Sequence, residues 1–331
     1  MSAKRVSVLA LSLMVALAVA ACSAATPAPS SEPTQPPTAA PTSVPTQAAT
    51  ATPAGQTVIT MGDIGSDPAV IIDGTQPIAD YIASKLGKYG ITKGQVKIAK
   101  DADEMTQWLK DGQVDLYFDS VYPAALISDA SGAKPFIRRW KGGVEQYHTV
   151  IFAAKSSGIT QVDQLNGHVI GFDNEYSTSG YVLPLAYLTE AGLTLVQKQS
   201  VGDTVGADEV GYTFSQADQN TIQWVDSGKL AAAATDNVTY SKLPDDVKSQ
   251  LVIVAETEAL PRQVGVVRPG IPDDLKNALV QVLINAGQDP DAAAALKSFQ
   301  GTTKFDEFPQ GIDQALTRIH QLEDIVKNAK K

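Results

Sequence analysis

Apolar and polar residues follow two alternating patterns over residues 57–150. Short apolar runs, typical of buried strands, alternate with segments whose apolar residues recur every three or four positions, as in amphipathic helices. Strands are expected at Thr57–Gly62, Val96–Ala99 and Val114–Phe118. Helices are expected at Gln76–Leu86, Asp103–Lys110 and Ser120–Ser128. This order predicts βαβ units around a mostly parallel sheet.

The same alternation returns in the second half of the chain. Further strands are expected at Tyr147–Ala154, Val169–Phe172, Leu251–Ala255 and Val264–Val267. Further helices are expected at Gly180–Glu190, Asn220–Asp226, Pro272–Ala286 and in the C-terminal segment around Ile319. We therefore predict an α/β fold with two lobes, each a mostly parallel sheet flanked by helices. Residues 57–150 and 262–331 would form lobe 1, and residues 151–261 would form lobe 2.

The N-terminus has the pattern of a secretory signal peptide over residues 1–21. Lys4 and Arg5 precede an apolar run of 16 residues, Val6–Ala21, which is shorter than the roughly 20 residues that a spanning helix needs. Cys22, the only cysteine, follows the run and resembles the acylated cysteine of a bacterial lipobox. The alternative is an incidental free thiol. Acylation would anchor the chain to a membrane, because each buried CH₂ adds about 0.8 kcal/mol.

We predict that residues 22–56, which begin with that cysteine, form a disordered tether. The 33 residues Ser23–Gly55 are rich in Ala, Thr, Pro and Ser and carry one charge, so they bury too little apolar surface to fold. Removal of the signal peptide leaves 24 basic and 36 acidic residues, a net charge of −12. An acidic chain without a basic stripe argues against nucleic acid as a partner.

Three consecutive hydroxyl residues, Ser177, Thr178 and Ser179, stand between a predicted strand and a predicted helix, with Gly180 after them. The first amides of a helix have no intrahelical partner, and the helix dipole is positive there. Such an end binds anions, and hydroxyl donors rotate to suit an oxyanion. Gly180 would let a ligand approach the backbone. The alternative is a simple helix cap that uses one hydroxyl.

The stretch Ser156–Leu193, which contains STSGYVLP, resembles the phosphate/phosphite/phosphonate-binding family of ABC-importer solute receptors. The segments GQVDLYF at Gly112–Phe118 and GKLAAAATDN at Gly228–Asn237 match the family as well. The resemblance implies a two-lobed periplasmic binding protein with a ligand cleft between its lobes, whose STSG residues hold the anionic head of a phosphorus compound. It also implies an ABC permease and its ATPase as partners, a monomeric chain, no cofactor and no metal.

The sequence departs from the family pattern in its presumed pocket loops. The loop after the VDLYF strand begins Asp119-Ser120 and includes Tyr122, Asp218 replaces a histidine of the family, and Arg262 lies in a late pocket segment. The two aspartates would repel an anion unless a proton is shared, or they would pair with an ammonium group of an aminoalkylphosphonate. Arg262 could bind an oxyanion in a bidentate manner. Each of these charges could instead be solvated, and Tyr122 could serve packing.

An enzyme is a competing function. The chain lacks the HExxH, GxSxG, P-loop and CxxC motifs, and its three histidines lie near no evident nucleophile. We therefore expect no catalysis. A sensor lipoprotein with the same fold would also fit the sequence, and so would a receptor for another oxyanion or a zwitterion. The expectation is an extracytoplasmic, lipid-anchored receptor for a small anionic ligand.

Overall fold

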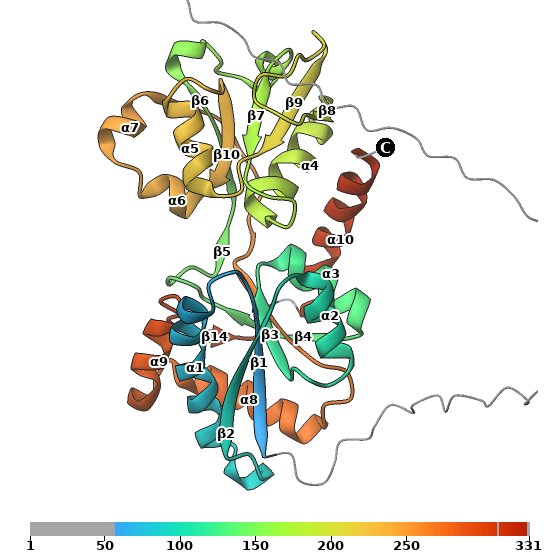
Figure 1. Cartoon of the computed structure of the whole chain (residues 1–331), viewed down its shortest axis with the longest axis vertical. Coiled ribbons are helices and arrows are strands. Elements are labelled where there is room, and N and C mark those ends of the chain that lie inside the picture. The colour runs from blue at the N-terminus through green and yellow to red at the C-terminus, as the bar shows by residue number, and fades with distance from the viewer. Residues whose placement is uncertain (1–56, 310, 330–331) are drawn as a thin grey trace, which may run out of the picture. The chain divides into compact units, whose positions relative to one another are not determined.

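The computed structural model describes residues 57–309 and 311–329, so the predicted signal peptide, Cys22 and the tether lie outside the described residues. Within the described part of the chain, two six-stranded sheets define two lobes (Figure 1). The sheet of lobe 1 has the order β14 (Phe305–Asp306), β4 (Lys134–Arg139), β13 (Gln263–Val267), β3 (Leu116–Asp119), β1 (Val58–Ile64), β2 (Lys93–Ala99). The sheet of lobe 2 has the order β11 (Leu251–Glu256), β6 (Thr149–Ala154), β10 (Ala232–Asp236), β7 (Val169–Phe172), β9 (Glu209–Phe214), β8 (Thr194–Gln197).

Both sheets are built around parallel strands. In lobe 1, β1 pairs in parallel with β2 and β3, and in lobe 2 β7 pairs in parallel with β9 and β10. The strands β13 and β6, which follow the crossings between the lobes, are antiparallel to their neighbours. The predicted α/β class with two parallel-rich sheets is confirmed, whereas the residue limits of the lobes stay a prediction.

Helices cover both sheets. Those of lobe 1 are α1 (Pro68–Lys85), α2 (Ala102–Lys110), α3 (Val121–Ser131), α8 (Asp273–Ala286) and α9 (Ala293–Ser298). Those of lobe 2 are α4 (Leu183–Glu190), α5 (Asp218–Asp226), α6 (Asn237–Ser241) and α7 (Asp245–Ser249). A π-helical turn, Thr178–Val182, precedes α4 directly. The predicted helix at residues 180–190 therefore begins two residues earlier and changes its winding after the first turn.

Helix α1 begins at Pro68, eight residues before the predicted start. The carboxylate of Asp67 accepts a hydrogen bond from the Val70 amide, and Pro68 occupies the first turn, where its missing N–H is not needed. Pro77 lies inside the helix. Proline and glycine usually interrupt a helix, so Pro77 and Gly74 led us to expect no helix over its first turns. Asp67 and Pro68 are residues typical of a helix start, but they were not recognised as one because Gly74 and Pro77 follow them.

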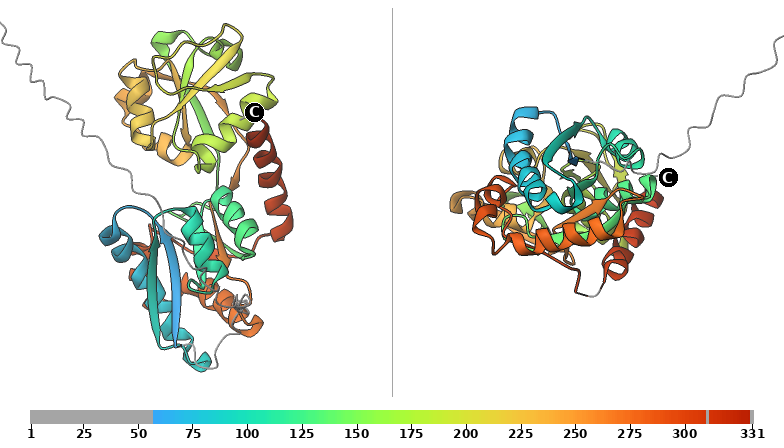
Figure 2. Two further views of the ribbon diagram at one scale, coloured as in Figure 1. Left: turned by 45° about the vertical axis from the view of Figure 1, so that its right-hand side comes forward. Right: turned by 90° about the horizontal axis from the view of Figure 1, so that it is seen from below.

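The lobes are joined by a short ribbon and by the C-terminal helix. Strands β5 (Gln146–Tyr147) and β12 (Leu260–Pro261) pair with each other between the two sheets (Figure 1). The single predicted strand at residues 147–154 is thus divided at His148 into β5 and β6. Helix α10 (Ile312–Ala329) contacts α3 of lobe 1 and α4 of lobe 2 (Figure 2).

One apolar cluster is shared by α3, α4 and α10. Its members include the fully buried side chains of Val121, Leu185, Leu188, Ile319 and Leu322. Burial of one such side chain stabilises a fold by about 1.5–3 kcal/mol. The C-terminal helix therefore packs against one helix of each lobe.

Candidate functional site

The hydroxyl turn, which we define as Ser177–Gly180, follows strand β7 after a short loop and opens the helical segment of α4. Ser177 caps this segment, because its Oγ accepts a hydrogen bond from the Gly180 amide at 3.0 Å. The amides of Thr178 and Ser179 therefore lie in the first helical turn, where N–H groups have no intrahelical acceptor. Thr178 and Ser179 are 1% and 7% exposed. Both residues are therefore shielded from bulk water by the protein around them.

The hydroxyl turn contacts the other lobe directly. The amide of Tyr122 donates a hydrogen bond of 3.1 Å to Oγ1 of Thr178. Tyr122 lies in the first turn of α3, which Ser120 precedes as the N-cap residue. The N-termini of α3 and of the α4 segment thus meet, one from each lobe. Because both helix ends carry positive potential, their junction favours an anion.

Tyr147, in strand β5 of the ribbon, contacts this junction. Its phenol lies within hydrogen-bonding distance of the side chains of Thr178 and Ser179, and burial raises the pKa of Tyr147. The hydroxyl of Thr149 donates a hydrogen bond of 2.6 Å to the backbone oxygen of Ser179. The hydroxyl turn is consequently held by contacts from the ribbon and from β6.

Gly180 has a structural reason for lacking a side chain. A Cβ atom at this position would lie 2.5 Å from Cβ of Asp173 and 2.9 Å from Oγ of Ser177. The amide of Asp173 also donates to the backbone oxygen of Gly180 at 3.0 Å. The close approach that the sequence suggested for a ligand is made by Asp173.

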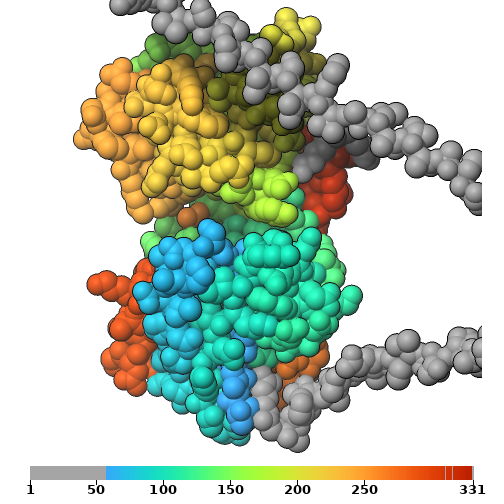
Figure 3. All heavy atoms as spheres, in the orientation of Figure 1, coloured from blue at the N-terminus to red at the C-terminus, as the bar shows by residue number. Residues whose placement is uncertain are grey.

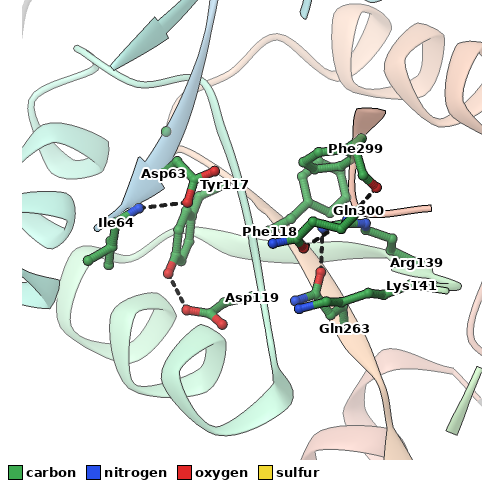
Figure 4. A pocket seen from close by; sticks show the side chains of 11 residues that line it. Asp63, Ile64, Tyr117, Phe118, Asp119, Arg139, Lys141, Gln263, Phe299 and Gln300 are labelled. Atoms are coloured by element: carbon green, nitrogen blue, oxygen red, sulfur yellow. Dashed lines mark hydrogen bonds between the residues drawn. The ribbon is translucent and has the colours of Figure 1, made fainter. Parts of the chain in front are cut away.

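Lobe 1 contributes a cavity of about 160 Å³ at the carboxyl ends of β1 and β3 (Figure 4). Asp63 and Asp119 lie on one side of this pocket, and Arg139 and Lys141 lie on the other. Ligands of α/β proteins bind in this position, outside the carboxyl ends of parallel strands. Figure 3 shows the surface hollowed between the two lobes.

The acidic side of the pocket is held by neutral donors. The Tyr117 hydroxyl and the Ser120 amide donate hydrogen bonds to the two carboxylate oxygens of Asp119. The hydrogen bond from the Ser120 amide measures 2.7 Å. Burial raises the pKa of Asp119 and of Asp63, although these hydrogen bonds act in the opposite direction. The Thr75 hydroxyl donates to Asp63 at 2.9 Å. Both carboxyl groups therefore take up protons more readily than a solvated aspartate.

The basic side of the pocket contains a guanidinium whose hydrogen-bond acceptors within residues 57–309 and 311–329 are all neutral. Arg139 is 1% exposed and donates to side-chain oxygens of Gln263, Gln300 and Thr302 and to the backbone oxygen of Phe299. Burial lowers the pKa of Arg139, yet a guanidinium keeps its proton at neutral pH.

Lys141 lies beside Arg139 in the pocket lining. Burial lowers the pKa of Lys141 to about 8, and the positive charges of Arg262 and Arg139 act in the same direction. Asp119 and Asp236 oppose this shift without reversing it. The ammonium group is therefore in an environment that disfavours its charge.

Lobe 2 places acidic groups near the hydroxyl turn. Asp218 accepts a hydrogen bond of 2.7 Å from the Thr235 hydroxyl. Burial raises the pKa of Asp218 to about 6, and the negative charges of Asp173 and Asp236 act in the same direction. Asp236 caps α6 by accepting hydrogen bonds from two backbone amides. This side of the site is negative, which suits a ligand that carries a proton or an ammonium group.

Arg262 lies between the two lobes. Its guanidinium stands 4.3 Å above the ring centroid of Tyr147, and its Nη1 atom is 3.9 Å from a carboxylate oxygen of Asp236. Its Nε atom is buried and has no hydrogen-bond partner among the described residues. Arg262 follows β12 immediately, so the ribbon determines its position.

The structure brings the predicted site residues to one region, and it adds others. Asp119, Ser120 and Tyr122 come from the end of β3 and the start of α3, and the hydroxyl turn and Asp218 come from lobe 2. Their role in binding stays a prediction. The residues that sequence reasoning missed are Asp63, Arg139, Lys141, Tyr147, Asp173 and Asp236. Arg139 and Lys141 were missed because strand β4 was not predicted. Asp63 is the penultimate residue of β1 and Asp236 is the last residue of β10, so both could have been found by that position.

A possible metal cluster lies elsewhere, between α3 and α10. Asp129, His320 and Glu323 offer ligand atoms within 4.8 Å of one another. Lys327 already binds Glu323 at 2.6 Å, and Asp129 is exposed. The occupied carboxylate and the exposure make this cluster a weak candidate for a bound ion.

Comparison with known proteins gives one family and several related structures. The family model described as "ABC transporter, phosphonate, periplasmic substrate-binding protein" matches residues 65–310. The structure of XAC2383 from Xanthomonas citri bound to chloride ion is similar, with 30% identity, a TM-score of 0.75, and coverage of 82% of this chain and 98% of that one. The same protein bound to ATP shows 29% identity, a TM-score of 0.74 and the same coverage.

A third structure shares the fold at lower identity. PhnD1 from Prochlorococcus marinus in complex with methylphosphonate shows 15% identity, a TM-score of 0.61, and coverage of 82% of this chain and 98% of that one. In addition, none of the helices formed by residues 57–309 and 311–329 combines the length and apolar character that a membrane crossing requires.

Proposed function

This chain belongs to the periplasmic substrate-binding proteins of phosphonate ABC transporters, and we propose that it binds a small phosphorus oxyanion between its lobes and delivers it to the permease. The ligand is a phosphonate, phosphite or phosphate. Proteins of this family are the substrate-binding component of a transporter, so a small-molecule ligand, a permease and its ATPase are the partners that the family implies. Catalysis is not part of this role.

The observation that carries the proposal is the junction of two helix N-termini at the hydroxyl turn. The amide of Tyr122 reaches Thr178 across the lobes at 3.1 Å, and both hydroxyls of Thr178 and Ser179 are buried beside it. Backbone amides and hydroxyls can surround an oxyanion without a lysine. A ligand at this junction would link the lobes, and closure about the ribbon would commit it to the site.

The charged residues around the junction would set which species binds. In this proposal Asp218 and Asp119 accept hydrogen bonds from a protonated oxyanion or from an ammonium substituent, and Arg262 supplies a bidentate donor. Ser120 adds the N-cap of α3 beside them. An aminoalkylphosphonate would use both signs of charge at once.

A phosphate ester is the second candidate, because XAC2383, at 29% identity, was solved with ATP. A larger ligand of this kind would bind through its phosphate groups at the same junction. The screen below therefore includes ATP beside the small anions.

The first experiment is a thermal-shift screen of the purified protein. The panel holds phosphate, phosphite, methylphosphonate, 2-aminoethylphosphonate, ATP, sulfate and glycine betaine. Ligand at 100 times its Kd stabilises a protein by about 2.7 kcal/mol, which shifts the midpoint of a domain this size by several degrees. A shift with at least one phosphorus compound supports the proposal, and a shift with glycine betaine alone overturns it.

The second experiment tests the hydroxyl turn itself. Thr178→Val with Ser179→Ala removes two hydroxyl groups with little change of side-chain volume, whereas Thr178→Ser keeps the hydroxyl and removes only a methyl group. Hydrogen bonds to a charged group are worth about 1.5–3 kcal/mol each, so the double variant should bind at least ~100-fold more weakly. Thr178→Ser should stay within ~10-fold. Full affinity of the double variant for every ligand would contradict the assignment.

We also propose that Cys22 carries the lipid anchor of an extracytoplasmic, monomeric receptor. Mass spectrometry of protein from membranes should find acyl chains on Cys22, and Cys22→Ser should release the protein. A sensor role is the competing function at the same site. Loss of ligand uptake in a deletion strain, with ligand-dependent signalling unchanged, would favour transport.

A further inference from the structure

Arg139 and Lys141 line the pocket, and Arg262 lies near them over the ring of Tyr147; we define these three residues as the cation cluster. Among the described residues, no carboxylate forms an ion pair with Arg139 or Lys141, and the one pair of Arg262, with Asp236, is long at 3.9 Å. The acidic residues across the pocket are bound by neutral donors instead. Acidic and basic side chains therefore line one pocket, and no ion pair between them is formed within the described residues.

The cluster retains donors that the protein does not use. The Lys141 ammonium lines the cavity and donates to no acceptor within residues 57–309 and 311–329. The Nε atom of Arg262 is buried without a partner in the same part of the chain. A buried charged donor without a partner is costly, so the Arg262 Nε atom, together with the half-buried Lys141 at the cavity, points to an anionic partner that is not part of the protein.

The cluster is adjacent to the hydroxyl turn and separate from it. The phenol of Tyr147 reaches Thr178 and Ser179, and the face of the same ring carries Arg262 at 4.3 Å. Arg262 in turn lies close enough to Lys141 for its charge to lower the pKa of that group. One tyrosine therefore separates two places that can hold an anionic group.

The cavity beside the cluster is small. Its volume of about 160 Å³ lies below the roughly 300–1,000 Å³ of sites for drug-sized molecules. It can hold one compact charged group, such as a carboxylate or a phosphonate, rather than a nucleoside.

We propose that the ligand of this protein carries two anionic groups, one bound at the hydroxyl turn and the second bound by Lys141 and Arg262. The inference rests on the proposed function and narrows it from phosphorus oxyanions in general to compounds with a second acid group. Asp63 and Asp119 stay on the far side of the pocket, held by Thr75, Tyr117 and backbone amides (Figure 4).

Isothermal titration with three probes tests this. Methylphosphonate has one anionic group, phosphonoacetate adds a carboxylate, and methylenediphosphonate adds a second phosphonate. Charge-assisted hydrogen bonds predict that at least one two-group probe binds ~10-fold or more tightly than methylphosphonate. Whichever two-group probe binds more tightly identifies the second group.

Variants assign the effect to the cluster. Lys141→Met removes the ammonium and keeps the length, and it should reduce the preference for the two-group probe below ~3-fold, whereas Lys141→Arg should keep it. Lys93→Met, on the exposed edge strand β2, is the matched control and should change nothing. Binding of an anion at Lys141 should also be accompanied by proton uptake at pH 8, seen as a binding enthalpy that depends on the ionisation enthalpy of the buffer.

The outcomes separate the two proposals. If none of the three probes binds, and no other phosphorus compound does, the proposed function fails and this inference fails with it. If methylphosphonate binds as tightly as both two-group probes, or if Lys141→Met keeps the full preference, the inference alone is overturned.

Discussion

Replacement of Lys141 by methionine should stabilise the protein at neutral pH. Burial and two neighbouring guanidinium groups lower the pKa of Lys141 from 10.5 to about 8. One pKa unit corresponds to 1.36 kcal/mol, so the charged form is disfavoured in the folded state by about 3 kcal/mol. Methionine keeps the length of the side chain and removes the charge.

The effect of Lys141 on the free energy of unfolding should depend on pH. Below pH 8 Lys141 is charged in both states, and the folded state bears the whole penalty. Between pH 8 and 10.5 the unfolded state binds more protons, so the free energy of unfolding of the native protein rises with pH. Above that range the penalty is gone. The advantage of the methionine variant should therefore shrink by about 2–3 kcal/mol between pH 7 and pH 10.

Urea denaturation of both proteins at pH 7, 8, 9 and 10 measures this difference. The groups that face Lys141 are Arg139, Arg262, Asp119 and Asp236, and they are common to both proteins. Their own titration therefore cancels to first order in the comparison. A stability difference that stays constant with pH would refute the reasoning, and so would a variant that is less stable at pH 7.

Three further outcomes are expected. Gly94→Ala should lower the free energy of unfolding by about 3 kcal/mol or more, because its Cβ would lie 2.3 Å from the backbone of Ala79, and misfolding or a large fall in Tm would show it. Asp218→Asn should remove a loss of stability of about 2 kcal/mol that the native protein shows as pH rises from 4 to 6, since burial raises the pKa of that carboxyl to about 6; parallel urea titrations would contradict this. Arg318→Gln breaks contacts to Glu190 and to a second glutamate at the surface, so urea midpoints should reveal a change of at most about 1 kcal/mol.

Local signals in the sequence predicted most of the elements around the site. The strand at residues 169–172 is observed with the predicted limits, and the helix predicted at 103–110 begins one residue earlier. These segments combine a clear period with capping residues, such as Asp101, whose carboxylate accepts a hydrogen bond from the Glu104 amide. Strands β8 and β9 were missed because mixed polar and apolar residues with glycine nearby hide their period.

The missed strand β4 shows why part of the site was not predictable. Its sequence, KPFIRR, contains a proline and three cations, which is an unfavourable composition for an inner strand. Pairing with β13 and β14 nevertheless places Arg139 in the interior, where side chains from residues 263, 300 and 302 and the backbone of residue 299 bind it. No local pattern encodes partners that lie so far away along the chain.

The sequence by itself determined the α/β class, the two lobes and the hydroxyl turn at a helix start, because periodicity, capping and turn chemistry act over a few residues. The tertiary structure decided which charges share the site. It brought Tyr122 to Thr178 across the lobes, filled the space beside Gly180 with Asp173, and placed Arg139 and Lys141 in the lining of one cavity. Electrostatic interactions and burial depend on distances in space, and only the packing of distant segments sets those distances.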